Sequence, residues 1–256
     1  MTEPLRLSHK IVQVVHLSLT TDDNQLERMK SVLSPDEAAR ADRFKVPQPR
    51  RHFIACRAML RELLAVGLNC PPTEVAFDYG PHGKPALRQT ASALQQIEFS
   101  VSHSSDHALI AITVGRRIGI DIEQLDSAVR ILKLAQRFFS PREATELLQL
   151  RDVDQLAGFY RGWTCKEAYL KATGFGLSFP LNKFSVALDP HQPARLIEVV
   201  DQPEELHRWR LLPLHPQPGF AAAVIFESSE KDEVTLMQST MLLRSGMPLG
   251  ALPDST

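Results

Sequence analysis

The sequence predicts an α+β fold in which one chain holds two similar α/β subdomains related by a pseudo-twofold axis. The helix-start pattern SPDEA at residues 34–38 returns as SPREA at residues 140–144, and Phe53 recurs as Phe159 at the same spacing. Each half also alternates strand-like and helix-like segments. Such self-similarity indicates two copies of one unit with a ligand cleft between them. A further match, which needs an insertion of four residues, pairs Ala58, Leu60 and Arg61 with Ala168, Leu170 and Lys171.

The first half contains four strand-like segments and two helices. Ser34 as N-cap, Pro35 at the first helical position and Glu37 three residues after the serine predict a helix with a capping box. Apolar spacing predicts an amphipathic helix over residues 50–66, after a break at Pro47 and Pro49. The strands are predicted over residues 11–19, 74–78, 97–102 and 107–114, with turns at residues 80–85 and 103–106.

The second half starts with the strand IGIDIE at residues 118–123, and a helix starts at Ser140. The segment WTCKEAYLKATG at residues 163–174 also has a helical pattern. We therefore expect a first subdomain over residues 1–116 and a second over residues 117–228. Residues 229–256 show little periodicity, and we expect a loosely ordered tail there.

The composition is typical of a soluble protein, with 43% hydrophobic and 23% charged residues among 256. A formal net charge of −1 provides no overall field to attract nucleic acid or an anionic membrane. The three cysteines have no CxxC spacing, which argues against a disulfide scaffold or a zinc site. Without an export signal or a long apolar run, the expected location is the cytoplasm.

Three acids and a lysine form the candidate reactive cluster. Residues two apart on a strand share a face, so Asp121 and Glu123 project together. On the helix, Glu167 and Lys171 are four apart and lie in one row. Two carboxylates from a strand and one from a helix suit Mg²⁺, so the pattern predicts a Mg²⁺ enzyme acting on a phosphate ester. The alternative is a solvated strand face and an ordinary helix surface pair, but charge that interrupts a buried apolar strand needs a partner.

A local basic segment runs from Arg40 to Arg61, and Asp42 is its one acid. It either holds a polyanionic ligand or an acidic protein, or forms the polar side of an amphipathic helix. Its basic residues are Arg40, Arg43, Lys45, Arg50, Arg51, Arg57 and Arg61.

Five motifs, taken together, resemble the 4′-phosphopantetheinyl transferases of the long, Sfp type over roughly residues 30–190. The resemblance implies the pseudo-dimeric α+β fold. It also implies transfer of the phosphopantetheine arm of coenzyme A to a serine of an apo acyl or peptidyl carrier protein, with release of adenosine 3′,5′-bisphosphate. The motifs are Gly83-Lys84-Pro85, Phe99-Ser-Val-Ser-His103-Ser, Gly119-Ile-Asp121-Ile-Glu123, Arg137-Phe-Phe-Ser-Pro141-Arg-Glu and Trp163-Thr-Cys-Lys166-Glu167-Ala-Tyr-Leu-Lys171.

The resemblance implies that Asp121, Glu123 and Glu167 hold Mg²⁺ on the diphosphate. Asp121, Glu167 and Lys171 are the expected catalytic residues, with Lys171 contacting the same phosphates. Glu167 is either a ligand alone or also the group that takes or relays the serine proton, and the sequence leaves this open.

The same resemblance implies the residues that bind coenzyme A. His103 matches a histidine that contacts its phosphates, with Ser102 beside it, and Lys84 and Pro85 match a loop that lies against the adenine nucleotide. Lys166 is either a ligand contact or solvent-exposed. The pattern departs at Glu37, where a lysine is expected, so Arg40, Arg51 and Arg57 are the expected substitutes toward the 3′-phosphate.

A monomer is expected, because the two-repeat arrangement differs from that of the short, trimeric class. Two other classes of protein fit the sequence less well. Mg²⁺ nucleases combine similar residues, but usually place Glu and Lys two apart on a strand. A non-catalytic module that only binds carrier proteins is disfavoured, because the expected acids and lysine are all present.

Overall fold

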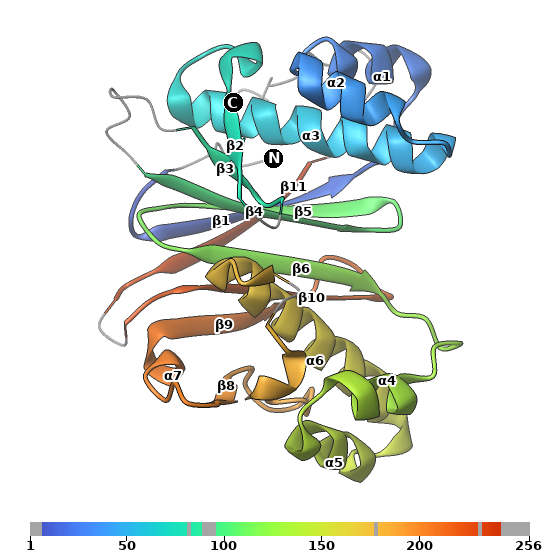
Figure 1. Cartoon of the computed structure of the whole chain (residues 1–256), viewed down its shortest axis with the longest axis vertical. Coiled ribbons are helices and arrows are strands. Elements are labelled where there is room, and N and C mark those ends of the chain that lie inside the picture. The colour runs from blue at the N-terminus through green and yellow to red at the C-terminus, as the bar shows by residue number, and fades with distance from the viewer. Residues whose placement is uncertain (1–6, 81–82, 89–95, 177–178, 230–231, 242–256) are drawn as a thin grey trace.

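Two sheets pack against each other between two long helices, which gives the order helix, sheet, sheet, helix in this computed structural model (Figure 1). The structure describes residues 7–80, 83–88, 96–176, 179–229 and 232–241. Within these ranges, no helix is both long and apolar enough to cross a membrane.

The first unit places its helices on the outer face of a four-stranded sheet, in the order β11-β1-β5-β4. A separate two-stranded sheet pairs β2 with β3. Its elements are β1 (Ile11–Ser18), α1 (Asp23–Lys30), α2 (Pro35–Asp42), α3 (Pro47–Leu68), β2 (Phe77–Tyr79), β3 (Pro85–Leu87), β4 (Ile97–Ser104) and β5 (His107–Val114).

The second unit has a three-stranded sheet in the order β6-β10-β9, and a two-stranded sheet pairs β7 with β8. The chain then returns to the first unit with β11 (Thr235–Met241). Its elements are β6 (Ile118–Gln124), α4 (Ile131–Phe138), α5 (Pro141–Gln149), α6 (Asp152–Thr173), β7 (Phe184–Val186), β8 (Leu196–Val199), α7 (Glu205–Arg208), β9 (Trp209–Leu214) and β10 (Phe220–Glu227).

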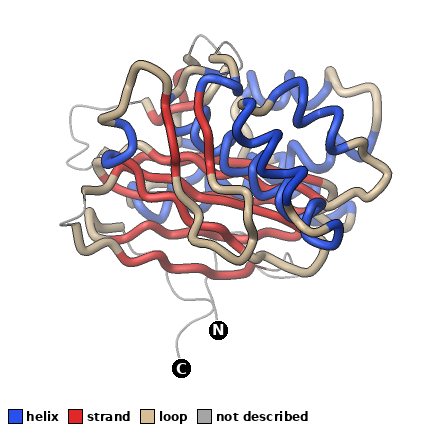
Figure 2. Tube along the Cα trace, turned by 90° about the horizontal axis from the view of Figure 1, so that it is seen from below, coloured by secondary structure: helices blue, strands red, loops and turns tan. Residues whose placement is uncertain are grey.

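The two units share one topology, which confirms the predicted fold class. In each unit, a central strand, β5 or β10, pairs antiparallel with two others. One partner is the first strand of the unit, and the other is the strand that comes just before the central strand in the chain, so β1-β5-β4 matches β6-β10-β9. The long helices α3 and α6 are both 22 residues long. Most strands of the molecule run roughly alongside one another in the view from below (Figure 2).

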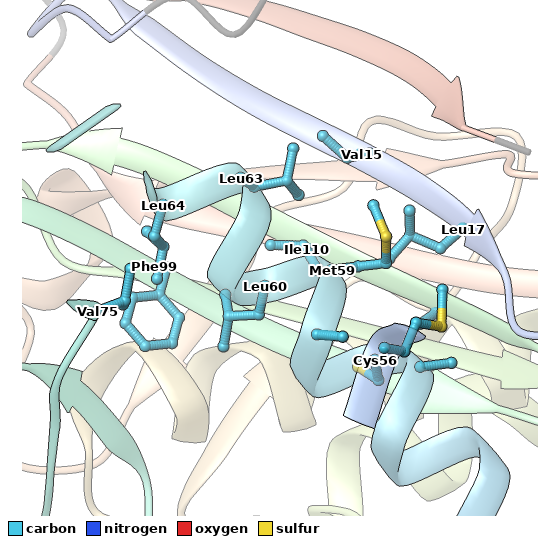
Figure 3. Close-up of a cluster of buried hydrophobic side chains, with 14 of the residues drawn as sticks. Val15, Leu17, Cys56, Met59, Leu60, Leu63, Leu64, Val75, Phe99 and Ile110 are labelled. Atoms are coloured by element: carbon cyan, nitrogen blue, oxygen red, sulfur yellow. The ribbon is translucent and has the colours of Figure 1, made fainter. Parts of the chain in front are cut away.

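The core of the first unit forms where α3 lies on the sheet (Figure 3). Met59, Leu60, Leu63 and Leu64 follow helical spacing and are nearly inaccessible to solvent, and they pack against Ile110 and neighbouring side chains of the strands. A second core fills the space between α6 and its sheet, and a third lies between the two sheets.

Helix α3 begins at Pro47, so the predicted break at Pro47 and Pro49 is wrong. The first turn of a helix has amide groups without helical partners, and it therefore accepts proline without losing a hydrogen bond. The segment predicted as a strand over residues 74–78 starts instead with a short 3₁₀ turn over Pro72–Glu74, and the strand begins at Phe77.

Each half contains a buried ion pair whose acid is the glutamate of the capping box. Glu37 accepts from the Nε of Arg61 at 2.6 Å, and Glu143 lies 2.7 Å from the Nζ of Lys166. Arg61 and Lys166 occupy the same position in helices of equal length. The match of Arg61 with Lys171 through an insertion of four residues is therefore wrong.

Residues 235–241 do not belong to a loose tail. They form β11, which runs parallel to β1 and pairs along it from Ile11 with Thr235 to Leu17 with Met241. None of its seven residues is fully buried and only Leu236, Met237 and Met241 are apolar, so the sequence lacks the apolar alternation that predicts a strand. The remainder of the predicted tail, residues 242–256, lies outside the described residues.

Candidate active site

Strand β6 separates two sets of side chains. Ile118, Ile120 and Ile122 are fully buried in the core between the sheets. Asp121 and Glu123 alternate with them and meet side chains of β4 instead. The predicted alternation is confirmed, and the strand carries both acids to the seam between the two units.

Helix α6 lies directly on β6 because Gly119 has no side chain. A Cβ at this position would lie 1.9 Å from the carbonyl oxygen of Ala168 and 2.6 Å from the amide nitrogen of Ala172. Backbone therefore packs against backbone. Glu167 and Lys171, on this segment of the helix, are held close to the strand that carries Asp121.

Lys171 forms an ion pair with the buried Asp121. Its Nζ donates to the Oδ1 of Asp121 at 2.7 Å and to the Oγ of Ser102 at 2.8 Å, and that hydroxyl donates to the same Oδ1 at 2.8 Å. The structure thus brings together Asp121, Lys171 and Ser102 from three separate elements.

The three carboxyl groups resist carrying charge at the same time. Burial raises the pKa of Asp121, an effect that Lys171 and Ser102 oppose. Burial also raises the pKa values of Glu123 and Glu167, and the carboxylate of Asp121 raises both further. Full ionisation of this cluster therefore calls for added positive charge.

A divalent cation fits the donor set, although the carboxylates are not yet gathered around one point. The Oδ2 of Asp121 is buried and has no hydrogen-bond partner among the residues that the structure describes. Oxygen ligands of this kind are those that Mg²⁺ prefers. Across the described ranges, no three Asp, Glu, His or Cys side chains stand in a ready coordination geometry. The ammonium group of Lys171 neutralises Asp121 instead.

Lys166 does not reach this site. Its side chain is fully buried, its Nζ donates to Glu143 and to the carbonyl oxygen of Phe184, and the ammonium lies over the ring of Phe184. The expectation that Lys166 contacts a ligand or lies in solvent is therefore wrong. Its neighbour Glu167 points elsewhere because successive helical residues are about 100° apart.

A cavity of about 420 Å³ opens beside the acids. Its walls come from the loop with Gly83, Lys84 and Pro85, from β4, and from the end of α6 with Glu167 and Lys171. The Nζ of Lys84 donates to the carbonyl oxygen of Lys171 at 2.6 Å, which ties the loop to the last turn of the helix. Burial lowers the pKa of Lys84.

A second cavity of about 440 Å³ brings together Arg40 and His103. His52 and Phe53 on α3 also line it, and the Nε2 of His52 lies 2.9 Å from Asp106. Burial lowers the pKa of His103, and His52 and Lys171 lower it further. His103 therefore lies within electrostatic reach of both this cavity and the acid cluster.

His52 was missed by the sequence reasoning, which considered only arginines as basic groups on this helix. The signal in the sequence is that His52 comes four residues after Gln48. In a helix that starts at Pro47 rather than at residue 50, this spacing places both on one face, and Gln48 lines the same cavity.

Arg51 and Arg57 do not line this cavity, although the guanidinium group of Arg57 lies over the ring of Phe53, which does. Arg51 forms an ion pair with Asp23 at 2.6 Å, at the start of α1. Arg57 is buried, with its Nε 3.4 Å from Glu37 and its guanidinium over the ring of Phe77. Of the three predicted arginines, Arg40 lies at the cavity and the other two do not.

Comparisons with known proteins find the same relationship in both halves. The family described as "4′-phosphopantetheinyl transferase superfamily" matches residues 117–225. The family described as "4′-phosphopantetheinyl transferase, N-terminal" matches residues 20–114.

Individual relatives are similar over most of their length. The chain is 41% identical to the 4′-phosphopantetheinyl transferase HetI of Nostoc sp., over 83% of this chain and 86% of that protein. It is 26% identical to the 4′-phosphopantetheinyl transferase Sfp of Bacillus subtilis, over 90% of this chain and 98% of Sfp. Among solved structures, it matches a holo-(acyl-carrier-protein) synthase of Bacillus anthracis in complex with CoA, with 26% identity over 44% of this chain and 96% of that chain and a TM-score of 0.32.

Proposed function

The chain belongs to the 4′-phosphopantetheinyl transferase superfamily, and we propose from this premise that its acid cluster transfers the 4′-phosphopantetheine arm of coenzyme A to a serine of an apo acyl or peptidyl carrier protein. The second product is adenosine 3′,5′-bisphosphate. One observation carries the proposal. Asp121 and Lys171 meet at the seam of the two units, beside a cavity that Glu167 lines.

Asp121, Glu123 and Glu167 would hold the divalent ion, which we take to be Mg²⁺. Two observations support this assignment. The Oδ2 of Asp121 has no hydrogen-bond partner within the described part of the chain, and the pKa values of all three acids are raised. When bound, the ion supplies positive charge that binds the diphosphate and stabilises the charge that develops on it.

Lys171 would contribute a second positive charge to the phosphates. Its ammonium group donates to Asp121 and Ser102, and with the charge of Asp121 balanced by the ion it would be free to contact a phosphate oxygen instead. Only a side-chain rotation is needed, because the lysine side chain is flexible and partly exposed.

The nucleotide end of coenzyme A would lie along the two cavities. Arg40 and His103 supply donors for phosphate at the second cavity, with His52 beside them. Lys84 and Pro85 form a wall for the adenine nucleotide at the first cavity. Ser102, on β4, donates its hydroxyl proton to Asp121 at the edge of the acid cluster. Arg51, Arg57 and Lys166 are not part of this proposal, since none of them lines either cavity.

The reaction requires one proton to leave the carrier serine. Its hydroxyl oxygen attacks the phosphorus that bears the pantetheine arm, the bond from that phosphorus to the bridging oxygen breaks, and adenosine 3′,5′-bisphosphate departs. Glu167 lines the cavity, and burial raises its pKa, so we assign it to take the proton directly or through a water.

The partners follow from this reaction: coenzyme A, and a carrier protein rather than nucleic acid or a membrane. We propose that the enzyme acts as a monomer, because one chain supplies both sides of the site. We place it in the cytoplasm, where the free thiols of Cys56, Cys70 and Cys165 fit a reducing environment.

The test is to incubate the protein with coenzyme A, Mg²⁺ and an apo carrier protein and to measure the intact mass of the carrier. A mass gain equal to one phosphopantetheine arm on the carrier serine is the expected result. Complex formation without a mass gain would favour a binding module, and nicking of added DNA would favour a nuclease. Carriers from fatty-acid, polyketide and peptide assembly lines, compared in single-turnover reactions, identify the preferred partner.

A further inference from the structure

Strands β4 and β6 lie beside each other, yet they belong to different sheets. The backbone ladder of β4 runs to β5 on one edge, and the ladder of β6 runs to β10. Figure 1 shows β6 next to β4 and β5 at the centre of the molecule. Other groups must therefore join the two units at this seam.

Three serines in alternate positions of β4 make this connection. Ser100 accepts from the backbone N–H of Ile120 at 3.1 Å. Ser102 donates to the carboxylate of Asp121 at 2.8 Å, and Ser104 accepts from the backbone N–H of Gln124 at 3.0 Å. Alternate residues of a strand share a face, so one row of hydroxyl groups replaces a backbone ladder.

Ser104 differs from Ser100 in one respect. Its hydroxyl also donates to the Oε2 of Glu123 at 3.0 Å, while its oxygen accepts from Gln124. A serine hydroxyl has a single proton, and here the backbone amide orients the oxygen so that this proton points to the carboxylate. The rotatable side chain of Glu123 is thereby tied to β4.

We propose that Ser104 is a positioning residue that keeps the carboxylate of Glu123 at the seam, close to Asp121, from where it can bind the divalent ion. The inference rests on the proposed function, because it assigns Glu123 to the ion. Ser104 itself touches neither coenzyme A nor the reacting atoms in this role. Hydrogen-bond partners of metal-binding side chains commonly change metal affinity by about 10–100-fold when they are removed.

The test measures divalent-ion binding directly, by calorimetric titration of Mg²⁺ or Mn²⁺ into the full-length protein with coenzyme A present. Ser104→Ala is expected to weaken binding by about 10–100-fold, with the KM for coenzyme A at saturating Mg²⁺ unchanged. Ser104→Thr keeps the hydroxyl group and is expected to restore most of the affinity. Thr113→Val is the matched control, because it removes a hydroxyl group from the neighbouring strand β5 whose partner is the backbone carbonyl of Ile11, away from both cavities, and it is expected to bind the ion as the wild type does.

A double-mutant cycle separates positioning from a general loss of folding. If Ser104 acts through Glu123, then Ser104→Ala adds no further loss of affinity in a Glu123→Gln background. An equal further loss in that background would overturn the proposal. So would a Ser104→Ala affinity within threefold of the wild type, or an equal loss of affinity in Thr113→Val.

The failure of this inference is distinguishable from failure of the proposed function. A wild-type protein that binds the ion and modifies the carrier, together with an unaffected Ser104→Ala variant, overturns the role of Ser104 alone. A wild-type protein that neither binds the ion nor modifies the carrier overturns both.

Discussion

Asp121 is subject to opposing demands. Burial raises its pKa, whereas the ammonium group of Lys171 and the hydroxyl group of Ser102 favour its ionised form. If a metal ion bound the same carboxylate, Lys171 would no longer be needed to balance its charge. Its ammonium group could then contact a phosphate of coenzyme A. The charge of Asp121 therefore affects both the packing of the buried site and the proposed binding of the ion.

Asp121→Asn is expected to lower the rate of arm transfer at least about 100-fold at every Mg²⁺ concentration, because the amide cannot supply a negative oxygen to the ion. The free energy of unfolding should change by about 1 kcal/mol or less, since the amide still accepts from Ser102 and a costly buried charge is removed. The measurements are carrier mass against time and urea unfolding. Asp42→Asn, on the distant helix α2, is the control, and recovery of the rate at high Mg²⁺ would contradict the ligand role of Asp121.

Lys166→Met tests whether the buried lysine is structural. Removal of one partner from a buried ion pair leaves Glu143 without compensation, so we expect a loss of about 3–5 kcal/mol in the free energy of unfolding. The KM for coenzyme A of the folded protein should stay the same. Lys10→Met, in an exposed pair with Glu233, should change stability by about 0.5 kcal/mol or less. A raised KM with unchanged stability would return Lys166 to the ligand site.

At the scale of elements, the sequence predicted the parts whose pattern is local. Strand β6 alternates apolar and acidic residues. The capping boxes at Ser34 and Ser140 mark the starts of α2 and α5. These signals depend on neighbouring residues alone. The predicted meeting of Asp121 with Lys171 followed from them and is seen in the structure.

The parts that could not be predicted depend on distant contacts. Strand β10 is buried along most of its length and lacks alternation, and β9 carries Pro213. Spacing shows that Lys166 and Glu167 face different ways, but not which of them is buried. The roles of Arg51 and Arg57 were uncertain for the same reason, because their acidic partners lie far away in the sequence.

Gly119→Ala is expected to separate α6 from β6. The added Cβ would meet backbone atoms of the helix, which cannot rotate away as a side chain could. We expect a loss of at least about 1–3 kcal/mol in the free energy of unfolding and a larger relative fall in kcat than in binding of coenzyme A. Gly80→Ala, where the nearest such contact is 3.8 Å, should keep the stability of the wild type. Wild-type kcat in Gly119→Ala would show that the close approach does not position the helix.

On the scale of the whole molecule, the duplication is symmetric in fold and asymmetric in chemistry. Strand β6 carries Asp121 and Glu123, whereas its counterpart β1 has no acid. The first unit contributes serines and His103 from β4 and Arg40 from α2. In the proposed function, two halves of the same fold therefore contribute different groups to one site at their seam.

The same seam holds a pair of histidines that links stability to pH. His16 Nε2 lies 3.0 Å from His107 Nδ1, and the ring of His107 meets Phe220 of the other unit edge-on. Burial lowers the pKa of both, the neighbouring ring lowers that of His16 further, and Asp106 partly opposes the shift in His107. Both histidines are therefore neutral in the folded protein where the unfolded chain binds protons.

Below about pH 6.5 the unfolded chain gains protons that the folded pair resists, so stability conferred by the pair falls as the pH decreases. We expect the free energy of unfolding to fall less in His107→Gln than in the wild type between pH 7.5 and pH 5.5. Urea unfolding at each pH gives the difference. Carboxyl groups with raised pKa values act in the opposite direction in both proteins, so they cancel in this comparison, and parallel pH profiles would contradict the role of the pair.

Strand β11 has a consequence for synthesis. Strand β1 lies inside its sheet only because residues 235–241 return to pair with it. A ribosome releases β1 long before it has made those residues, so the sheet of the first half remains one strand short during most of translation. The open edge of β1 on the nascent chain offers unpaired backbone groups to chaperones or to other chains, until the last described strand covers it.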